Sequence, residues 1–369
     1  MPPQKFNIIR QFRNNKLLRI FLASSIAFLI FIIIIFLAQT HKRISIIDAI
    51  ANISDQELKS CITANSSKQS ASFSYELKNL ICPLELNSYN QPLYISNLTG
   101  LEQFRYLELL DLSNSKINSL KEIKQISSLK KLKLSSANIF MINDLSSLSH
   151  LEELDLSENS IRNASALSNL TKLQKLNLAN NNIGDLEFLS HLVNLKTLIL
   201  RSNLINSIAG LESHTQLVEL DLSNNSIYNI YSLSNLRYLE KLDLSHNQIQ
   251  VLIPLSKLSS IKTLNLTANK IEDVTALREL TAQKLYLANN NISLGIRELY
   301  TEMQSKKYPR KILINLEGNN RIPCQEIQVL KSKLSELDEL EILEPKVCSE
   351  KVRPIKKKKR LWKLWNRSK

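Results

Sequence analysis

The chain has 369 residues, a formal net charge of +14 and only five glycines. A basic charge of this size is typical of nucleic-acid-binding proteins, but here it is confined to the two ends of the chain. Residues 1–43 carry seven Lys or Arg and no acid, and residues 351–369 carry ten and no acid. The body is therefore nearly neutral, and we expect no nucleic-acid partner. No phosphate-binding loop and no hydrolase motif is present, so we predict neither an enzyme nor a cofactor.

The N-terminus predicts a membrane anchor. Residues 1–19 carry five basic side chains, and residues 20–38 are 19 consecutive uncharged residues. As a helix this run is about 28 Å long, enough to cross a bilayer core. The charge distribution favours a cytoplasmic segment 1–19 and a single-pass transmembrane helix, with the rest of the chain in the periplasm or on the cell surface. A cleaved signal peptide is the alternative.

Residues 44–100 are predicted to form an N-terminal cap with a degenerate first repeat. Ser54 and Glu57 have the spacing of a capping box, which predicts the start of a helix containing Cys61. Residues 80–86, which include Cys82, are typical of an imperfect strand. A helix laid over the first turn of a solenoid would cover its apolar edge.

Residues 101–292 consist of repeats. The frame Leu-x-x-Leu-x-Leu-x-x-Asn-x-Ile is complete in residues 217–227 and 239–249, and this pattern with its period identifies leucine-rich repeats. Its reference leucines recur every 22 residues, with the last one residue early: Leu110, Leu132, Leu154, Leu176, Leu198, Leu220, Leu242, Leu264 and Leu285. We number the repeats one to nine by these leucines.

The conserved places of the frame have physical roles. The paired leucines alternate as a short strand requires, and stacked turns bury them together. An Asn at the ninth place can donate and accept hydrogen bonds where the strand turns away, and it is expected to form a ladder through Asn159, Asn181, Asn203, Asn225, Asn247, Asn269 and Asn290. The first two repeats have Ser115 and Ala137 there, so the ladder should be incomplete at that end. The second half of each unit favours a turn of 3₁₀ helix or an extended run over a full α-helix.

The repeats resemble those of the bacterial internalins and of the leucine-rich regulatory subunit of protein phosphatase 1. This resemblance implies an α/β fold, a right-handed leucine-rich repeat solenoid with a parallel concave β-sheet and helical caps. It also implies a partner, commonly a protein, held on the concave face. An intracellular scaffold like the phosphatase subunit, with reduced cysteines, is one alternative function.

The concave face is the predicted binding surface. The residue between the paired leucines should face outward in every turn, and the residue after the pair is small in every repeat except the fifth, where it is Arg201. Interface hot spots are typically Trp, Tyr and Arg, which favours a ligand centred on repeats five to nine. The candidate partner-binding residues are Asp155, Asn177, Ile199, Arg201, Asp221, Asp243, His246, Asn265 and Tyr286.

Residues 293–349 are predicted to form an irregular last repeat and a C-terminal cap. We expect a helix over residues 296–306, a strand over 312–316 and an amphipathic helix from Cys324 to about Leu334. The four cysteines lie only in the two caps. Because the anchor places them in an oxidising space, we predict disulfides Cys61 to Cys82 and Cys324 to Cys348, although four cysteines permit three connectivities.

Residues 350–369 form a basic tail that contains two tryptophans. Trp beside Lys or Arg is typical of an anionic membrane interface, and a solvated disordered tail is the alternative. The candidate lipid-binding residues are Lys356, Lys357, Lys358, Lys359, Arg360, Trp362, Lys363 and Trp365. A second alternative function follows, in which the solenoid is a structural spacer and the tail binds anionic lipid or an envelope polyanion.

Other polar and aromatic residues give weaker signals. The five histidines occupy different places in their repeats, so no metal site is expected and a surface position is the default for each. Only His246 is expected on the concave side. Tyr228, Tyr231 and Tyr238 form an aromatic group off the sheet, and we interpret some of them as packing residues.

Overall fold

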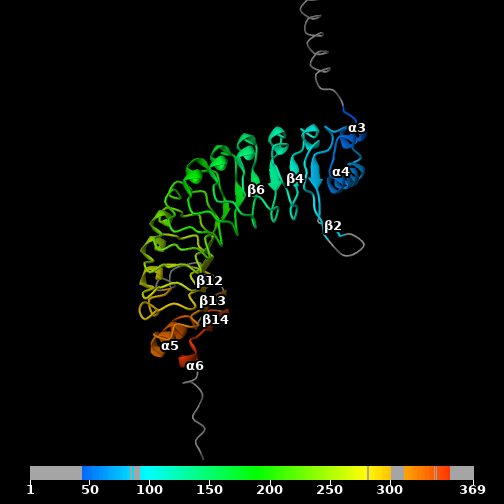
Figure 1. Ribbon diagram of the computed structural model, residues 1–369. Coiled ribbons are helices and arrows are strands. Elements are labelled where there is room, and N and C mark those ends of the chain that lie inside the picture. The colour runs from blue at the N-terminus through cyan, green and yellow to red at the C-terminus, as the bar shows by residue number, and fades with distance from the viewer. Residues whose placement is uncertain are drawn as a thin grey trace, which may run out of the picture.

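The computed structural model describes residues 44–83, 85–86, 92–280, 282–300, 311–335, 337 and 339–349. They form a curved solenoid whose strands line the inner side and whose 3₁₀ turns line the outer side (Figure 1). The predicted anchor at residues 20–38 and the basic tail at residues 350–369 lie outside these residues. Within the described ranges, no helix combines the length and the apolar character needed to cross a bilayer.

One parallel sheet runs the length of the solenoid, with twelve strands in the part of the chain that the structure describes. Each strand pairs with the next one along the chain, so the sheet order follows the sequence order. The strands are β1 (Asn79–Ile81), β4 (Leu109–Asp111), β5 (Lys131–Lys133), β6 (Glu153–Asp155), β7 (Lys175–Asn177), β8 (Thr197–Ile199), β9 (Glu219–Asp221), β10 (Lys241–Asp243), β11 (Thr263–Asn265), β12 (Lys284–Tyr286), β13 (Lys311–Asn315) and β14 (Glu339–Leu343).

The reference leucines are in register across the sheet, as their spacing predicted. Leu198 pairs with Leu176 on one side and with Leu220 on the other, and the column runs from Leu80 to Ile314. Every reference leucine is at most 1% exposed. Each contributes roughly 1.5 to 3 kcal/mol by burial, and the buried residues form one continuous core from cap to cap.

The outer side of the solenoid consists mainly of single 3₁₀ turns, one of the two forms predicted for the second half of a repeat, whereas repeat five has turns without a 3₁₀ helix. In repeat two the amide of Leu148 donates to the carbonyl of Leu145 over three residues, and both side chains are fully buried. Apolar residues three apart match the period of a 3₁₀ helix. The turns are η2 (Leu101–Gln103), η3 (Ile123–Gln125), η4 (Asn143–Ser147), η5 (Ser165–Asn169), η6 (Glu187–His191), η7 (Tyr231–Leu233), η8 (Ile253–Leu255) and η9 (Thr275–Leu277).

The predicted asparagine ladder is present. Asn203 Nδ2 donates to the carbonyls of Leu178 at 2.9 Å and Leu200 at 3.0 Å, and its Oδ1 accepts from the amide of Ile183 at 3.0 Å. The same contacts recur from Asn159 onward and extend one turn beyond the prediction, to Asn319. Each amide therefore satisfies buried backbone groups of two adjacent turns.

The N-terminal cap contains two helices, α3 (Ile46–Ala51) and α4 (Gln56–Lys68). The prediction that Ser54 caps the second helix is wrong, because Asp55 is the N-cap residue. Asp55 Oδ1 accepts from the amide of Leu58 at 3.0 Å, while its Oδ2 accepts from the amides of Ser96 at 2.8 Å and Asn97 at 3.0 Å. One carboxylate thus ties the helix start to the first repeat, which a Ser hydroxyl has too few oxygens to do.

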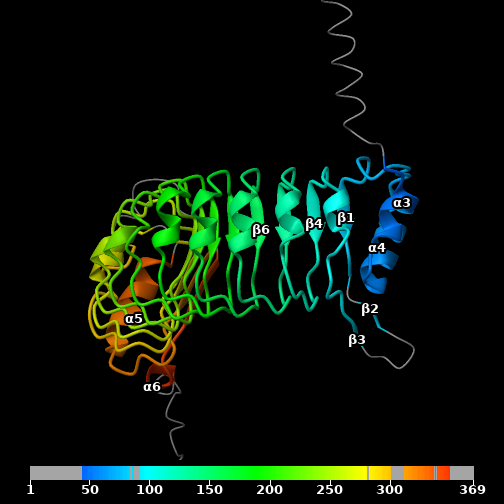
Figure 2. The same ribbon diagram turned by 45° about the horizontal axis from the view of Figure 1, so that its top comes forward.

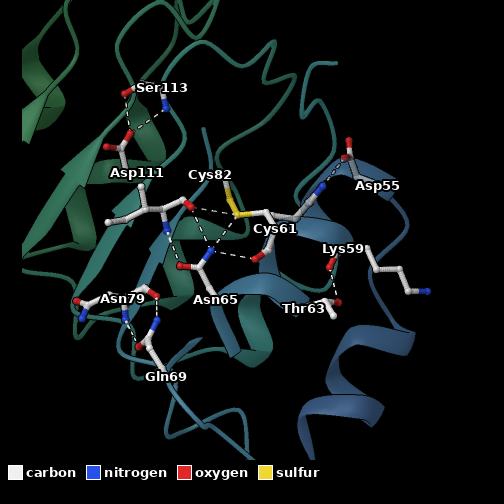
Figure 3. The surroundings of a disulfide bond; sticks show 12 residues. Asp55, Lys59, Cys61, Thr63, Asn65, Gln69, Asn79, Cys82, Asp111 and Ser113 are labelled. Carbon is white, nitrogen blue, oxygen red and sulfur yellow. Dashed lines mark hydrogen bonds between the residues drawn. A yellow bond between two sulfur atoms is a disulfide. The ribbon is translucent and has the colours of Figure 1, made fainter. Parts of the chain in front are cut away.

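Helix α4 lies against the free edge of β1 and is bonded to it by the predicted disulfide from Cys61 to Cys82 (Figure 3). Asn65 Nδ2 donates to the carbonyl of Ile81 at 3.1 Å, and Gln69 Nε2 donates to the carbonyl of Asn79 at 2.5 Å. Four residues of helix rise about 6 Å, close to the two-residue repeat of a strand. The two amides therefore take the place of a neighbouring strand at this edge.

The predicted strand over residues 80–86 is shorter than expected. Strand β1 ends at Ile81, and the chain then leaves the sheet for a small antiparallel hairpin of β2 (Glu85–Leu86) and β3 (Pro92–Leu93) (Figure 2). Pro83, which lacks a backbone donor, comes two residues after the end of β1.

The C-terminal cap begins with β13, which confirms the predicted strand. It continues with α5 (Cys324–Lys333), the expected amphipathic helix, then β14 and α6 (Lys346–Ser349), which the sequence did not predict. The disulfide from Cys324 to Cys348 joins the first residue of α5 to α6. Of the helix predicted over residues 296–306, residues 296–300 form turns and the remainder lies outside the described residues.

Candidate functional site on the concave sheet

The candidate site lies on the concave sheet, in the column of residues between the paired leucines. The strand register aligns this column from Asp111 through Ile199 to Tyr286, and its members are half-buried. Seven of the nine predicted partner-binding residues lie in it; the other two are Arg201 and His246. The structure thus places these seven predicted residues in one column on the concave face.

Most Asp and Asn side chains of the column have a structural role. Asp155 Oδ1 accepts from the amide of Ser157 at 2.9 Å and from its hydroxyl at 2.7 Å. Asp221 and Asp243 make the same pair of contacts with the serine two residues later, while Asn177 and Asn265 accept from the corresponding amide. These side chains satisfy the backbone where each strand ends. Their recurrence therefore follows from the turn and requires no ligand.

Lys133, Ile199 and Tyr286 are the exceptions in the column, because none of them has a side-chain acceptor that can make this contact. At Ile199 the exception is double: the residue two places later is the exposed Arg201 instead of a small side chain. Among the described residues, the backbone amide of Arg201 has no hydrogen-bond acceptor in place of the missing carboxylate. Repeat five therefore presents an apolar side chain, a guanidinium and an unpaired amide donor together.

Leu204 is a third exception in the same repeat, and it is not among the partner-binding residues predicted from the sequence. It is 62% exposed and follows the ladder residue Asn203. The same place in the flanking repeats holds Asn182 and Ser226, which are also exposed. A leucine that breaks a polar column was a signal available in the sequence, and it adds an exposed apolar group within five residues of Ile199.

The electrostatic surroundings of Arg201 are acidic. Burial raises the pKa of Asp221, on the neighbouring strand, above its ordinary value; the nearby Asp243 also raises it, while Ser223 and Arg201 lower it. Asp243 has a further partner, because its Oδ2 accepts from Asn265 Nδ2 at 2.9 Å. The carboxylate of Asp221 is thus influenced electrostatically by both Arg201 and Asp243.

The histidines differ from prediction in one case. His246 is exposed at the end of its strand, with a left-handed φ of 55°, a conformation that the corresponding residues of the other repeats share. The surface position expected for His214 is wrong, because this residue is fully buried. It occupies the place held by Leu192 and Leu236 in the adjacent turns, and its Nε2 lies 3.1 Å from the carbonyl oxygen of Leu189. Burial lowers the pKa of its imidazole.

The three tyrosines of repeat six lie on the surface and not in the core. Tyr228, Tyr231 and Tyr238 are 67%, 61% and 63% exposed, so the interpretation as packing residues is wrong. Nowhere in the described ranges do three His, Cys, Asp or Glu side chains come together in a way that could hold a metal ion. The predicted lipid-binding residues of the tail lie outside those ranges.

Comparison with protein-family models identifies leucine-rich repeats directly. The model described as Leucine Rich repeats (2 copies) matches residues 149–191 and 239–279. Comparison with curated protein sequences gives no significant match.

Comparison with solved structures shows an internalin-like fold. Internalin C2 of Listeria monocytogenes is 24% identical, with a TM-score of 0.55 over 62% of this chain and 98% of its own. Internalin F of the same organism is 24% identical, with a TM-score of 0.51 over 81% and 97%. The ectodomain of the Arabidopsis thaliana membrane receptor kinase GASSHO1/SCHENGEN3, in complex with CASPARIAN STRIP INTEGRITY FACTOR 2, is 23% identical, with a TM-score of 0.56 over 73% of this chain and 32% of the receptor chain. At these identities the likeness is one of fold.

Proposed function

We propose that this leucine-rich repeat chain is a non-enzymatic protein-binding module that faces the outside of the cytoplasmic membrane and binds its partner on the concave sheet around Ile199 and Arg201. The observation that carries the proposal is the double exception in repeat five. Six repeats use an Asp or Asn to close the strand end, and repeats two and nine have Lys133 and Tyr286 followed by a small residue. Repeat five instead combines an apolar side chain with an arginine two places later, and it leaves the Arg201 amide unpaired.

These groups are suited to a protein surface. Arg is frequent among interface hot spots, and a hot-spot truncation typically costs 2 kcal/mol or more of binding free energy. Ile199 and the exposed Leu204 supply apolar contact area, while the Arg201 guanidinium and amide supply donors for a carboxylate or carbonyl of the partner. The Asp and Asn side chains of the column are bonded within the chain and would contribute shape rather than specific contacts.

The extracytoplasmic location rests on the cysteines and the N-terminal sequence. Both cap disulfides are formed, and no cysteine is free. Disulfides persist mainly in oxidising compartments, which favours this location over an intracellular scaffold. The uncharged run at residues 20–38 would supply the membrane anchor. Thiol counting on the denatured, non-reduced protein from cells tests this part, and four free thiols would overturn it.

Site-specific photocrosslinking in intact cells tests the binding surface. A photoreactive residue at position 199 should give a discrete adduct with one protein, and the additional substitution Arg201→Ala should abolish that adduct. Position 133 is the matched control, because Lys133 lies in the same column and also makes no strand-end contact. Equal adducts at 199 and 133, unaffected by Arg201→Ala, would reject the proposed surface.

A further inference from the structure

A hollow on the outer side of the solenoid, near its N-terminal end, is unrelated to the concave sheet. Its volume is about 620 Å³, and it lies where η2, η3 and η4 stack. Glu102, Glu122 and Asp144 contribute three carboxylates to its lining, and Lys121 and Lys124 contribute two ammonium groups. The other lining residues are uncharged and polar, so the side chains of this hollow favour a polar or charged ligand.

Glu122 is the unusual member of this lining. It is 5% exposed, and its Oε2 has no hydrogen-bond donor among the described residues. The repeat does not require an acid here, because Ala166, Gly210 and Ala276 occupy the same place in other turns. Burying a carboxylate without a partner is unfavourable, and such groups are usually paired. Oε2 of Glu122 therefore lacks a partner within the described residues, and Lys121 is the only cation paired with the carboxylate there.

Lys121 fills that role only loosely. Its Nζ lies 3.5 Å from Glu122 Oε1, and its side chain is 72% exposed. An exposed lysine is held weakly and is readily displaced. The terminal torsion of a glutamate is broad, so rotation of the carboxylate can turn Oε2 toward the hollow once another cation replaces Lys121.

The missing partner is better matched by an organic cation than by a metal ion. In the described part of the chain, no three acidic side chains are close enough together to hold a metal. A guanidinium has five donors in one plane and needs no closed coordination shell. We propose that this hollow binds a guanidinium or ammonium group, which pairs with Glu122 and is further attracted by Glu102 and Asp144.

Two sources of that cation are distinguished by two probes. Agmatine represents a free small molecule, and N-acetyl-arginine methylamide represents an arginine side chain of a protein. Each is titrated into the folded full chain, and binding is followed by the shift of the thermal midpoint and by calorimetry. Saturable binding of agmatine alone would assign the hollow to small cations, whereas preference for the peptide-like probe would assign it to a protein side chain.

Substitutions in the hollow test whether the probes bind there. Glu122→Gln keeps the shape and removes the charge, so it should weaken binding about tenfold or more. The matched control is Glu187→Gln, which changes an exposed acid of η6 outside the hollow and should leave affinity unchanged. Lys121→Ala removes the competing cation and should strengthen binding about two- to threefold.

Thermal unfolding without ligand distinguishes a ligand-binding role of Glu122 from a structural role. If Glu122 is an unpaired carboxylate, Glu122→Gln alone should have a thermal midpoint no lower than that of the natural chain. A lowered midpoint would show that the carboxylate is already paired, and the proposal would fail. It would also fail if neither probe binds, or if both bind Glu122→Gln as well as the natural chain. Should Glu122→Gln not fold, unchanged affinity in Lys121→Ala is the result that overturns it.

Discussion

Replacing His214 with leucine is expected to remove part of the pH dependence of folding. His214 is fully buried in a column that Leu192 and Leu236 continue on either side. A leucine therefore fits the place that the repeat provides. The substitution removes the hydrogen bond from Nε2 to the Leu189 carbonyl oxygen. That oxygen still accepts a hydrogen bond from the amide of Leu192 at 2.8 Å. Near pH 7.5 the free energy of unfolding should change by only about 1 kcal/mol.

The sign of the pH effect follows from the direction of the pKa shift. Burial holds the pKa of His214 in the folded chain below its ordinary value of 6.5. Below that pH the unfolded chain binds a proton that the folded chain does not, so stability falls as pH falls, until the folded pKa is reached. For one proton the loss is at most about 1.4 kcal/mol per pH unit. The nearby Glu212 carboxylate opposes part of this loss, because it raises the pKa of the imidazole.

Urea unfolding of the natural chain and of His214→Leu at pH 7.5, 6.5 and 5.5 measures this difference. The natural chain should lose more stability than the variant, mainly between pH 6.5 and 5.5. His191→Gln is the matched control, since His191 is exposed in the preceding repeat and should leave the slope unchanged. The pKa of Asp55 is lowered from its ordinary value of 3.8, so its effect should fall below this pH range. The pKa of Asp221 is raised, but this group is present in both proteins, so its effect cancels in the comparison. Identical slopes for the natural chain and His214→Leu would refute the reasoning.

Three further predictions concern the ladder and the caps. Asn203→Ala should destabilise the chain by about 1 to 3 kcal/mol, measured by urea unfolding, because it leaves buried backbone groups of two turns unpaired; no change would show that water replaces the amide. Replacing Cys324 and Cys348 together with serine should lower stability by about 3 kcal/mol for a loop of sequence separation 24, and calorimetry of both proteins checks this value. The double variant Asn65→Ala, Gln69→Ala should expose the edge of β1 and promote association, measured by light scattering; a monomer of unchanged stability would contradict the edge-capping role.

The sequence predicted the parts of the fold that depend on spacing. The leucine period determined the register, and the amide at the ninth place determined the ladder, because each repeat solves the same local packing problem as the next. The same period could also have placed His214, since it is 22 residues from Leu192 and from Leu236. The expectation of a surface position for every histidine did not take this column of buried leucines into account, and it was therefore wrong for His214.

Other features depended on contacts that no local pattern encodes. Ser54 and Asp55 are both good N-cap residues, and the choice between them is made by the amides of Ser96 and Asn97, about 40 residues away. Strand β14 lacks the leucine frame and is recognised only by its pairing with β13. At the candidate site, the sequence identified Ile199 and Arg201 but could not show that the aspartates around them are occupied by strand-end contacts.

The in-register stacking of the turns has a consequence for how such a chain can diversify. Inserting one 22-residue unit between repeats two and five would translate Ile199 and Arg201 along the rod by one strand spacing, about 4.8 Å, while their own neighbours stayed the same. Reach from the N-terminal cap and choice of ligand are thus independent variables. Duplication of a repeat can lengthen the solenoid, and point substitutions on the concave sheet can change which ligand binds. Neither change affects the other.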